Sequence, residues 1–219
     1  MTRHESNQGE EKMGKAMSRT IITEEFMGAF VNVCEPETTM NGEQRYTITM
    51  VFPAGADLSE LKAIGNEVVK QEFTSGMPAN FRNPFRLSDE PTGKGSIPSD
   101  SWNFPKGSTF VKATSKFKPS IAILEENGNL VECVNPADIY AGAFYRAKVH
   151  AWCYNGNTGS GVSFSINSIM KSKDGENIGG GGGGSASQDF AAFGNPTQAQ
   201  QPAQAQQPAQ AQAGNDMFM

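Results

Sequence analysis

Charged and aromatic side chains alternate with small apolar ones over residues 143–154, which read Ala-Phe-Tyr-Arg-Ala-Lys-Val-His-Ala-Trp-Cys-Tyr. Strict alternation predicts a half-buried strand, because successive side chains of a strand point to opposite faces. One face holds the apolar set Ala143, Tyr145, Ala147, Val149, Ala151 and Cys153. The other face holds Phe144, Arg146, Lys148, His150, Trp152 and Tyr154. Cations in a row with flat rings could neutralise phosphates and stack on unpaired bases.

An ordinary solvent-facing strand could carry the same residue types, because aromatic and basic residues are common on exposed strands. A second predicted strand, at residues 108–117, repeats the arrangement and weakens that alternative. One of its sides carries Phe110, Lys112, Thr114, Lys116 and, just beyond the strand, Lys118. The other side carries Val111, Ala113, Ser115 and Phe117. Two strands with cations on one face and small or apolar residues opposite favour a nucleic-acid surface.

Catalytic and metal chemistry have no matching pattern in the chain. There are only two histidines, and neither lies in a nucleophile or metal motif. His150 and Cys153 are three residues apart, so on a strand they face opposite ways and do not chelate one ion together. The glycines at 179–184 are followed by a polar tail, whereas a phosphate-binding loop opens a helix. We therefore expect a protein that is not an enzyme, without catalytic residues, metal or cofactor.

Composition limits where a nucleic-acid site could lie. The 219 residues carry a net charge of -5, so a site for phosphates must be a local patch. The three cysteines, Cys34, Cys133 and Cys153, are too scattered for a disulfide framework and suggest a reduced, cytoplasmic protein. No apolar run approaches the ~20 residues of a membrane span, and the polar start lacks a signal peptide.

Two strands and a helix are expected in the first part of the ordered chain. Apolar residues alternate over 19–33, where Gly28 could mark a bulge or bend, and a second strand spans 45–52. This second strand should point Tyr46, Ile48, Met50 and Phe52 inward and Arg45, Thr47 and Thr49 outward. A helix follows at 58–73, with Asp57 as N-cap and Glu60 completing a capping box. Its apolar stripe is Leu58, Leu61, Ile64, Gly65, Val68 and Val69.

Residues 75–106 are rich in Pro and Gly, and a connection this long is usually functional or mobile. Its aromatic and basic side chains could close over a nucleic-acid strand. Alternatively, Phe81, Phe85 and Trp102 could fix the loop to the core, and the sequence leaves both open. Two hairpins follow, one turning at residues 125–129 and one at 156–159, and the last strand spans 161–171.

Both ends of the chain look unstructured. We expect a disordered tail at 1–18, one folded domain at 19–177 and a disordered Gly/Gln/Ala/Pro-rich tail at 178–219. The tail ends in an apolar tip with an acid, Asp216, Met217 and Phe218. Such a tip on a long tether is typical of a docking peptide, although it could also be an end without function.

Strands, one helix and a long loop predict a mainly β protein, an OB-fold-like (oligonucleotide/oligosaccharide-binding) small β-barrel. The strand order, the segment Ala-Gly-Ala-Phe-Tyr-Arg-Ala at 141–147 and the Gly-rich exit resemble single-stranded DNA-binding proteins of tailed phages. The resemblance is strongest over residues 140–180. It implies an OB-fold that coats single-stranded DNA during replication, recombination and repair, and a C-terminal tail that contacts phage or host replication proteins. Tails of that family tend to be acidic with a terminal aromatic, whereas this one has few acids and ends in Met219.

We therefore predict a single-stranded DNA-binding protein with little sequence preference, acting in the cytoplasm of an infected bacterial host. The predicted DNA-binding residues are Phe110, Lys112, Lys116, Lys118, Arg146, Lys148, His150, Trp152 and Tyr154. The alternative is a phage structural or decoration β-protein without nucleic-acid binding, which would explain the strands and the glycine tether but not two cation-lined faces. No membrane partner is expected, and the oligomeric state stays open.

Overall fold

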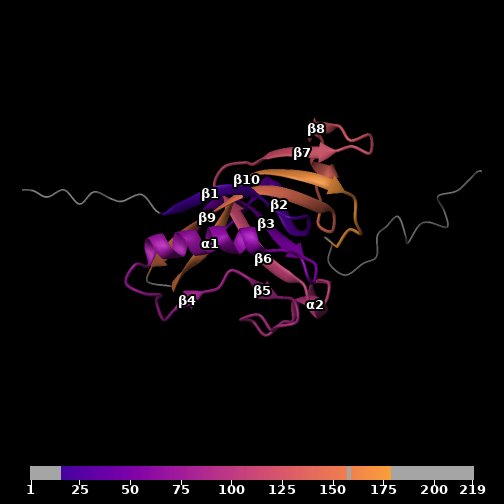
Figure 1. Ribbon diagram of the computed structural model, residues 1–219. Helices are drawn as coiled ribbons and strands as arrows, with labels where there is room; N and C mark the ends of the chain where they lie inside the picture. The colour runs from indigo at the N-terminus through magenta and orange to yellow at the C-terminus, as the bar shows by residue number, and fades with distance from the viewer. Residues whose placement is uncertain (1–15, 157–158, 179–219) are drawn as a thin grey trace, which may run out of the picture. The chain divides into compact units, whose positions relative to one another are not determined.

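The computed structural model describes residues 16–156 and 159–178, in which β-strands predominate (Figure 1). The longer strands are β1 (Met17–Ile22), β2 (Phe26–Thr38), β3 (Gln44–Phe52), β6 (Thr109–Ser115), β7 (Ser120–Leu124), β9 (Phe144–Gly156) and β10 (Gly159–Lys173). The short elements are β4 (Phe81–Arg82), β5 (Arg86–Leu87), α2 (Pro98–Ser101), β8 (Leu130–Glu132) and the 3-10 turn η1 (Pro136–Asp138). The main helix is α1 (Ser59–Glu72). The proposed docking tip, Asp216 to Phe218, lies outside the described residues, as do the rest of 179–219 and residues 1–15.

Five strands close into a ring, which confirms the predicted OB-like barrel. Strand β2 pairs with β3, β3 with β6, β6 with β10, β10 with β9, and β9 returns to β2. Within this ring of five strands, the β6–β10 pairing is parallel and the other four are antiparallel. The closure between β9 and β2 is short, with Phe26 opposite Tyr145 and Met27 opposite Phe144. Outside the ring, β1 pairs with β9, and β7 extends the sheet from β10 toward β8.

The alternating segment at 19–33 forms two strands where the sequence predicted one. The break at residues 23–25 lets β1 and β2 pair with successive stretches of β9. Thr23 bridges the break, because its amide donates to the carbonyl of Ala147 at 2.9 Å and its hydroxyl accepts from the Ala147 amide at 3.1 Å. The break falls on the polar run Thr23-Glu24-Glu25, and the buried positions change from odd numbers in β1 to even numbers at the start of β2.

Gly28 and Tyr145 pack closely against each other where β2 pairs with β9 and closes the barrel. The ring of Tyr145 is fully buried, and a Cβ added to Gly28 would lie 2.6 Å from its Cε2 atom. The Tyr145 hydroxyl donates to the carbonyl of Tyr140 at 2.7 Å, and burial raises the pKa of this phenol. The β2–β3 register shifts just after Gly28, and Phe30 has a φ of 47°. The predicted bend is therefore present, but Gly28 itself is needed for close packing.

Helix α1 covers one side of the barrel with the predicted apolar stripe (Figure 1). Leu61, Ile64 and Val68 are buried in the main core with the inward residues of β9 and β10. The predicted capping box does not form. Leu58, and not Asp57, occupies the N-cap position, although the carboxylate of Asp57 accepts from the Ser59 amide at 2.9 Å. The carboxylate of Glu60 pairs with Arg19 instead. In the described part of the chain, no helix is long and apolar enough to cross a membrane.

The long connection at 75–106 is packed on the barrel by its aromatic residues. Phe85 meets the core residue Phe164 edge-on with 5.9 Å between ring centroids, and Phe81 lies 5.9 Å from Phe73. Trp102 belongs to a second small core with Phe104. These contacts favour the interpretation in which the aromatic side chains fix the loop to the barrel.

Two threonines of β3 that the sequence predicted to point outward, Thr47 and Thr49, are buried. Asn32 of the neighbouring strand β2 lies opposite Thr47, and its side-chain amide donates to the Thr47 hydroxyl at 3.3 Å. The outer face of β3 is therefore partly covered, and less of it is open to a ligand than alternation indicates.

Candidate nucleic-acid interface

Strand β10 lies between the two strands that carry the predicted basic faces. Its residue Ser165 pairs with His150 of β9 on one side and with Thr114 of β6 on the other. Neighbouring strands are about 4.8 Å apart, so the outer faces of β6 and β9 are separated by roughly 10 Å. Two faces that the sequence identified separately therefore belong to one surface of the barrel.

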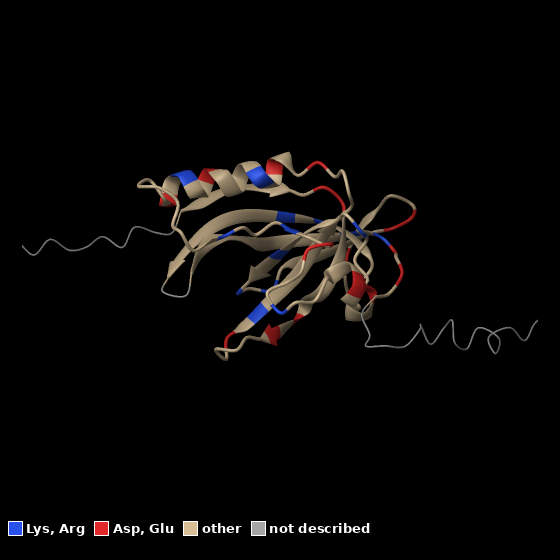
Figure 2. Cartoon of the chain, turned by 90° about the horizontal axis from the view of Figure 1, so that it is seen from below, with Lys and Arg blue, Asp and Glu red and all other residues tan. Residues whose placement is uncertain are grey.

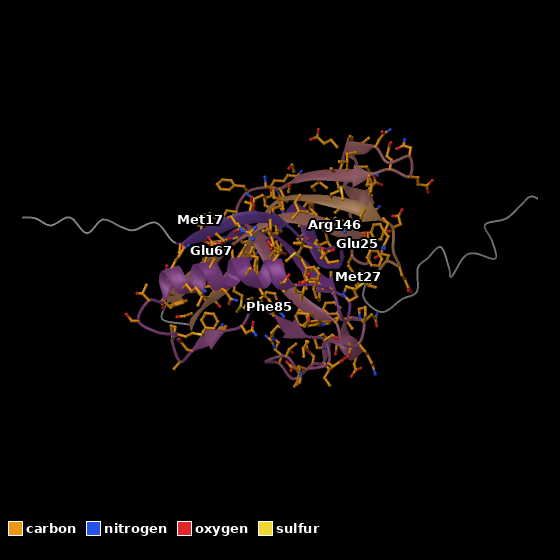
Figure 3. The ribbon with its side chains drawn as sticks, viewed as in Figure 1. Met17, Glu25, Met27, Glu67, Phe85 and Arg146 are labelled. Carbon is orange, nitrogen blue, oxygen red and sulfur yellow. The ribbon has the colours of Figure 1, made fainter. Side chains whose placement is uncertain are left out.

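A groove of about 560 Å³ opens on this surface, and we call it the basic groove. Its lining residues are Met17, Arg45, Thr114, Ser115, Lys116, Phe117, Lys118, His150, Trp152, Ser165, Ile166 and Asn167. Met17 lies on β1, at the edge of the sheet (Figure 3). The lining includes three cationic side chains, and none of its residues is an Asp or Glu. Four of the nine predicted DNA-binding residues meet here, namely Lys116, Lys118, His150 and Trp152.

Cations in and near the basic groove differ in how far carboxylates neutralise them. Among the described residues, Lys116 and Lys118 form no ion pair within 4.0 Å, although Lys116 is near enough to help lower the pKa of Glu43. Arg45 is paired with Glu43 at 2.5 Å. Lys112 lies outside the groove lining, and its Nζ is 2.8 Å from Oε1 of Glu37. The pair Lys116 and Lys118 thus offers the groove its least neutralised charge.

The aromatic and imidazole groups of β9 form the other part of the groove. Nδ1 of His150 lies 2.9 Å from Oδ1 of Asn167, a hydrogen bond that fixes the ring against β10. Trp152 is half-buried and meets Tyr154 edge-on, with 6.2 Å between ring centroids. Tyr154 itself lies outside the groove lining and continues the row of rings along β9.

Two predicted cations, Arg146 and Lys148, line a different hollow of about 590 Å³ between β9, β10 and the β7–β8 hairpin. The Arg146 guanidinium donates to the Thr23 carbonyl at 3.1 Å and lies 3.6 Å from a carboxylate oxygen of Glu24. Arg146 also lies near Glu25 (Figure 3) and helps to lower the pKa of that carboxyl. Arg146 therefore holds the β1–β2 junction, whereas Lys148 is exposed.

Phe110 is not brought to the basic groove. Its ring lies 5.4 Å from that of Phe104 and 6.2 Å from that of Trp102, in the second small core. Phe110 is near the start of β6, whereas the groove is reached at the end of that strand. This packing gives Phe110 a structural role at the loop 75–106.

Eight of the twelve lining residues are not among the predicted DNA-binding residues, and Met17, Arg45 and Phe117 are the largest of them. Phe117 was assigned to the apolar face of its strand, but its side chain is 81% exposed. The strand ends at Ser115, so alternation no longer predicts where Phe117 points. A usable signal was present in the sequence, because Pro119 argues against a strand continuing through this Lys-Phe-Lys segment.

Charge is distributed unevenly over the barrel. Strands β3, β6, β9 and β10 carry Lys or Arg and contain no Asp or Glu. Figure 2 shows acidic residues gathered in the connecting loops and on α1. The net charge of -5 therefore coexists with a sheet surface on which phosphates would meet cations.

Comparisons with known proteins agree with this geometry. A family model described as "Enterobacter phage Enc34, ssDNA-binding protein" matches residues 19–202. Among curated proteins, no sequence matches. The solved structure of the single-stranded DNA-binding protein from bacteriophage Enc34 in complex with ssDNA superimposes with a TM-score of 0.54 at 17% identity, covering 73% of this chain and 89% of that one. The crystal structure of gp2.5, a single-stranded DNA-binding protein encoded by bacteriophage T7, gives a TM-score of 0.50 at 14% identity, with coverage of 76% and 98%. At these identities the two structures support the fold alone.

Proposed function

This chain belongs to the family of the Enterobacter phage Enc34 single-stranded DNA-binding protein, and on this basis we propose that it binds single-stranded DNA with little sequence preference. One observation in the structure supports the proposal most strongly. The basic groove places Lys116 and Lys118 beside the ring of Trp152 on the outer face of an OB-like barrel. The family is one of DNA-binding proteins, so the expectation that the chain is not an enzyme is confirmed. No observation favours a structural or decoration protein.

Binding combines two interactions. The ammonium groups of Lys116 and Lys118 attract phosphates, and Trp152 offers a flat surface on which a base stacks. Every base has such a face, so stacking tolerates any sequence. The hydroxyls of Thr114 and Ser165 line the groove between them, and a hydroxyl can either donate to or accept from a base edge. The groove is therefore suited to many bases and selects strongly for none.

A salt titration tests the proposal. Full-length protein is titrated into a fluorescently labelled oligothymidylate of about 20 nucleotides, longer than the roughly 4–16 nucleotides one OB-fold covers. With three to five phosphates engaged, the logarithm of the affinity should fall with the logarithm of salt concentration at a slope of about -2 to -3.5. A shuffled mixed-sequence oligonucleotide of the same length should bind with similar affinity. A flat salt response, or no binding, would contradict the groove assignment.

We further propose that the protein coats and protects single-stranded DNA during phage replication, recombination and repair, in the cytoplasm of the infected host. An outer groove without base-specific contacts suits coating, because a coat must accept whatever sequence is exposed. Nuclease protection of long single-stranded DNA at saturating protein would test this role. Unchanged digestion under saturating conditions would argue for local rather than coating binding.

The C-terminal tip is proposed to dock on a replication protein through Asp216, Met217 and Phe218. The proposal rests on the sequence alone, on the apolar tip, its acid and the preceding glycines. Full-length protein and a chain ending at residue 178 are compared in pull-downs from infected-cell extract. A partner should be retained only by the full chain. DNA affinity should stay equal or rise slightly, because the removed segment carries Asp189 and Asp216 but no Lys or Arg. Loss of DNA binding on truncation would place the tail in the DNA site instead.

A further inference from the structure

One large aromatic side chain in the basic groove is exposed without a packing role. Phe117 lies in the short connection between β6 and β7 and is 81% exposed. Phenylalanine is usually buried, because water is a poor solvent for an apolar ring. Its neighbours in sequence are Lys116 and Lys118, neither of which forms an ion pair within 4.0 Å among the described residues. An exposed ring between two such cations suggests a contact with an anionic aromatic ligand.

The backbone at Phe117 is held although its ring is free of the core. The Phe117 amide donates to the hydroxyl of Ser115 at 3.1 Å. Two residues further on, Pro119 is buried. A short connection anchored on both sides presents the ring at a defined place, so little conformational entropy would be lost when a ligand covers it.

Phe117 and Trp152 line the same groove from opposite sides of β10. Phe117 follows β6, Trp152 belongs to β9, and β10 pairs with both of these strands. Polar groups of Ser165 and Asn167 lie on the β10 part of the lining. The groove, with a volume of about 560 Å³, thus has an aromatic residue on each side and hydrogen-bonding groups between them.

We propose that Phe117 is a second stacking surface, which together with Trp152 takes unpaired bases and makes the groove selective for single-stranded over duplex DNA. This inference rests on the proposed function. Both faces of a base in a duplex are covered by neighbouring base pairs, so only an unpaired base can offer its face to a ring. The lysines beside Phe117 attract the phosphates of single-stranded and of duplex DNA alike. The aromatic ring, rather than the charge, therefore distinguishes single-stranded from duplex DNA.

The test measures affinity for a labelled oligothymidylate and for a duplex hairpin of equal phosphate number. Full-length wild type is compared with Phe117→Ala, Phe117→Leu and the control Met77→Ala. Met77 is also exposed, at 62%, but lies outside both the basic groove and the hollow that Lys148 lines. Phe117→Ala should weaken single-strand binding by about 5- to 150-fold, the usual effect of losing one stacked base. Its duplex affinity and its salt slope should equal those of the wild type, because no charge changes.

The leucine variant separates stacking from apolar bulk. Phe117→Leu keeps an apolar side chain but loses the flat ring, so it should bind as weakly as Phe117→Ala. The melting temperature of each variant should be unchanged, because the side chain contacts little of the core. Full binding by Phe117→Leu, or equal losses on single-stranded and duplex DNA, would overturn the stacking role.

A third measurement follows Trp152 directly. In a Trp102→Phe background, Trp152 is the only tryptophan, and its fluorescence should be quenched by single-stranded DNA. If the wild type binds and Phe117→Ala binds equally well, only the present inference fails. If the wild type binds no single-stranded DNA, the proposed function fails and this inference with it. If Phe117 serves a protein contact, Phe117→Ala will bind DNA normally, which also overturns the proposal.

Discussion

Lys112 of β6 and Glu37 of β2 form an ion pair, with 2.8 Å between Nζ of the lysine and Oε1 of the glutamate. The hydrogen bond from Lys112 holds the pKa of the Glu37 carboxyl below its usual value. Glu37 therefore remains charged down to acidic pH and continues to neutralise Lys112. This pair, 75 residues apart in sequence, reduces the charge that a predicted DNA-binding lysine could offer to phosphates.

Glu37→Gln should strengthen binding to single-stranded DNA, because it releases Lys112 while keeping the shape of the side chain. If Lys112 then reaches one more phosphate, the salt slope should steepen by about 0.7. Glu126→Gln, in the turn at 125–129, removes the same charge outside the groove lining and should leave the slope unchanged. An equal gain from both variants would show that net charge, and not the Lys112–Glu37 pair, governs affinity.

Lys116→Ala combined with Lys118→Ala should flatten the salt slope by about 1.4, since two phosphate contacts are lost. The matched control is Lys62→Ala with Lys70→Ala on α1, which removes the same charge outside the basic groove and should change the slope little. Lys148→Ala gives a third comparison, because Lys148 lines the neighbouring hollow. A slope that responds to Lys148 and not to Lys116 and Lys118 would move the DNA path to that hollow.

Trp152→Ala should weaken single-strand binding by about 1–3 kcal/mol, the usual contribution of one stacked base. Its salt slope should stay that of the wild type, because the charges remain. Titrations at several salt concentrations measure both quantities together. If Trp152→Ala unfolds the domain, as followed by circular dichroism, then Trp152 belongs to the core and the loss of binding has another cause.

Gly28→Ala should destabilise the barrel by about 1–3 kcal/mol, the usual cost of overpacking a core. The added Cβ would lie 2.6 Å from Cε2 of Tyr145, whose ring is closely surrounded. Gly93→Ala is the control, because an added Cβ there meets nothing within 4 Å. Urea unfolding of both variants measures the free energies, and equal stability of the two would show that the Tyr145 ring moves aside freely.

Acid should weaken the junction between β1 and β2. The Glu25 carboxyl has a pKa below its usual value of 4.5, chiefly because the Lys173 ammonium donates to it at 2.6 Å. A carboxyl with a lowered folded-state pKa stabilises the fold above its unfolded-state pKa, and that stabilisation disappears as pH falls through the folded value. Glu25→Gln should therefore lower the melting temperature at pH 7, and this difference should shrink as the pH falls below 4.5. A difference that stays the same size on acidification would contradict this linkage.

The sequence alone determined which residues share a face within β6, β9 and α1. Alternation in β6 and β9 correctly separated buried Val111 and Val149 from the outward cations, because the two-residue period is a local property of extended backbone. The stripe of α1 was equally predictable, since its apolar spacing follows the turn of the helix.

Tertiary structure decided how these faces combine. That β10 separates β6 from β9, and so joins His150 and Lys118 in one groove, depends on pairing between segments far apart in sequence. The pairing of Lys112 with Glu37 and the packing of Phe110 on Phe104 likewise depend on distant residues. Phe117 became part of the groove because its strand ends two residues earlier, and a local period carries no information beyond the end of its element.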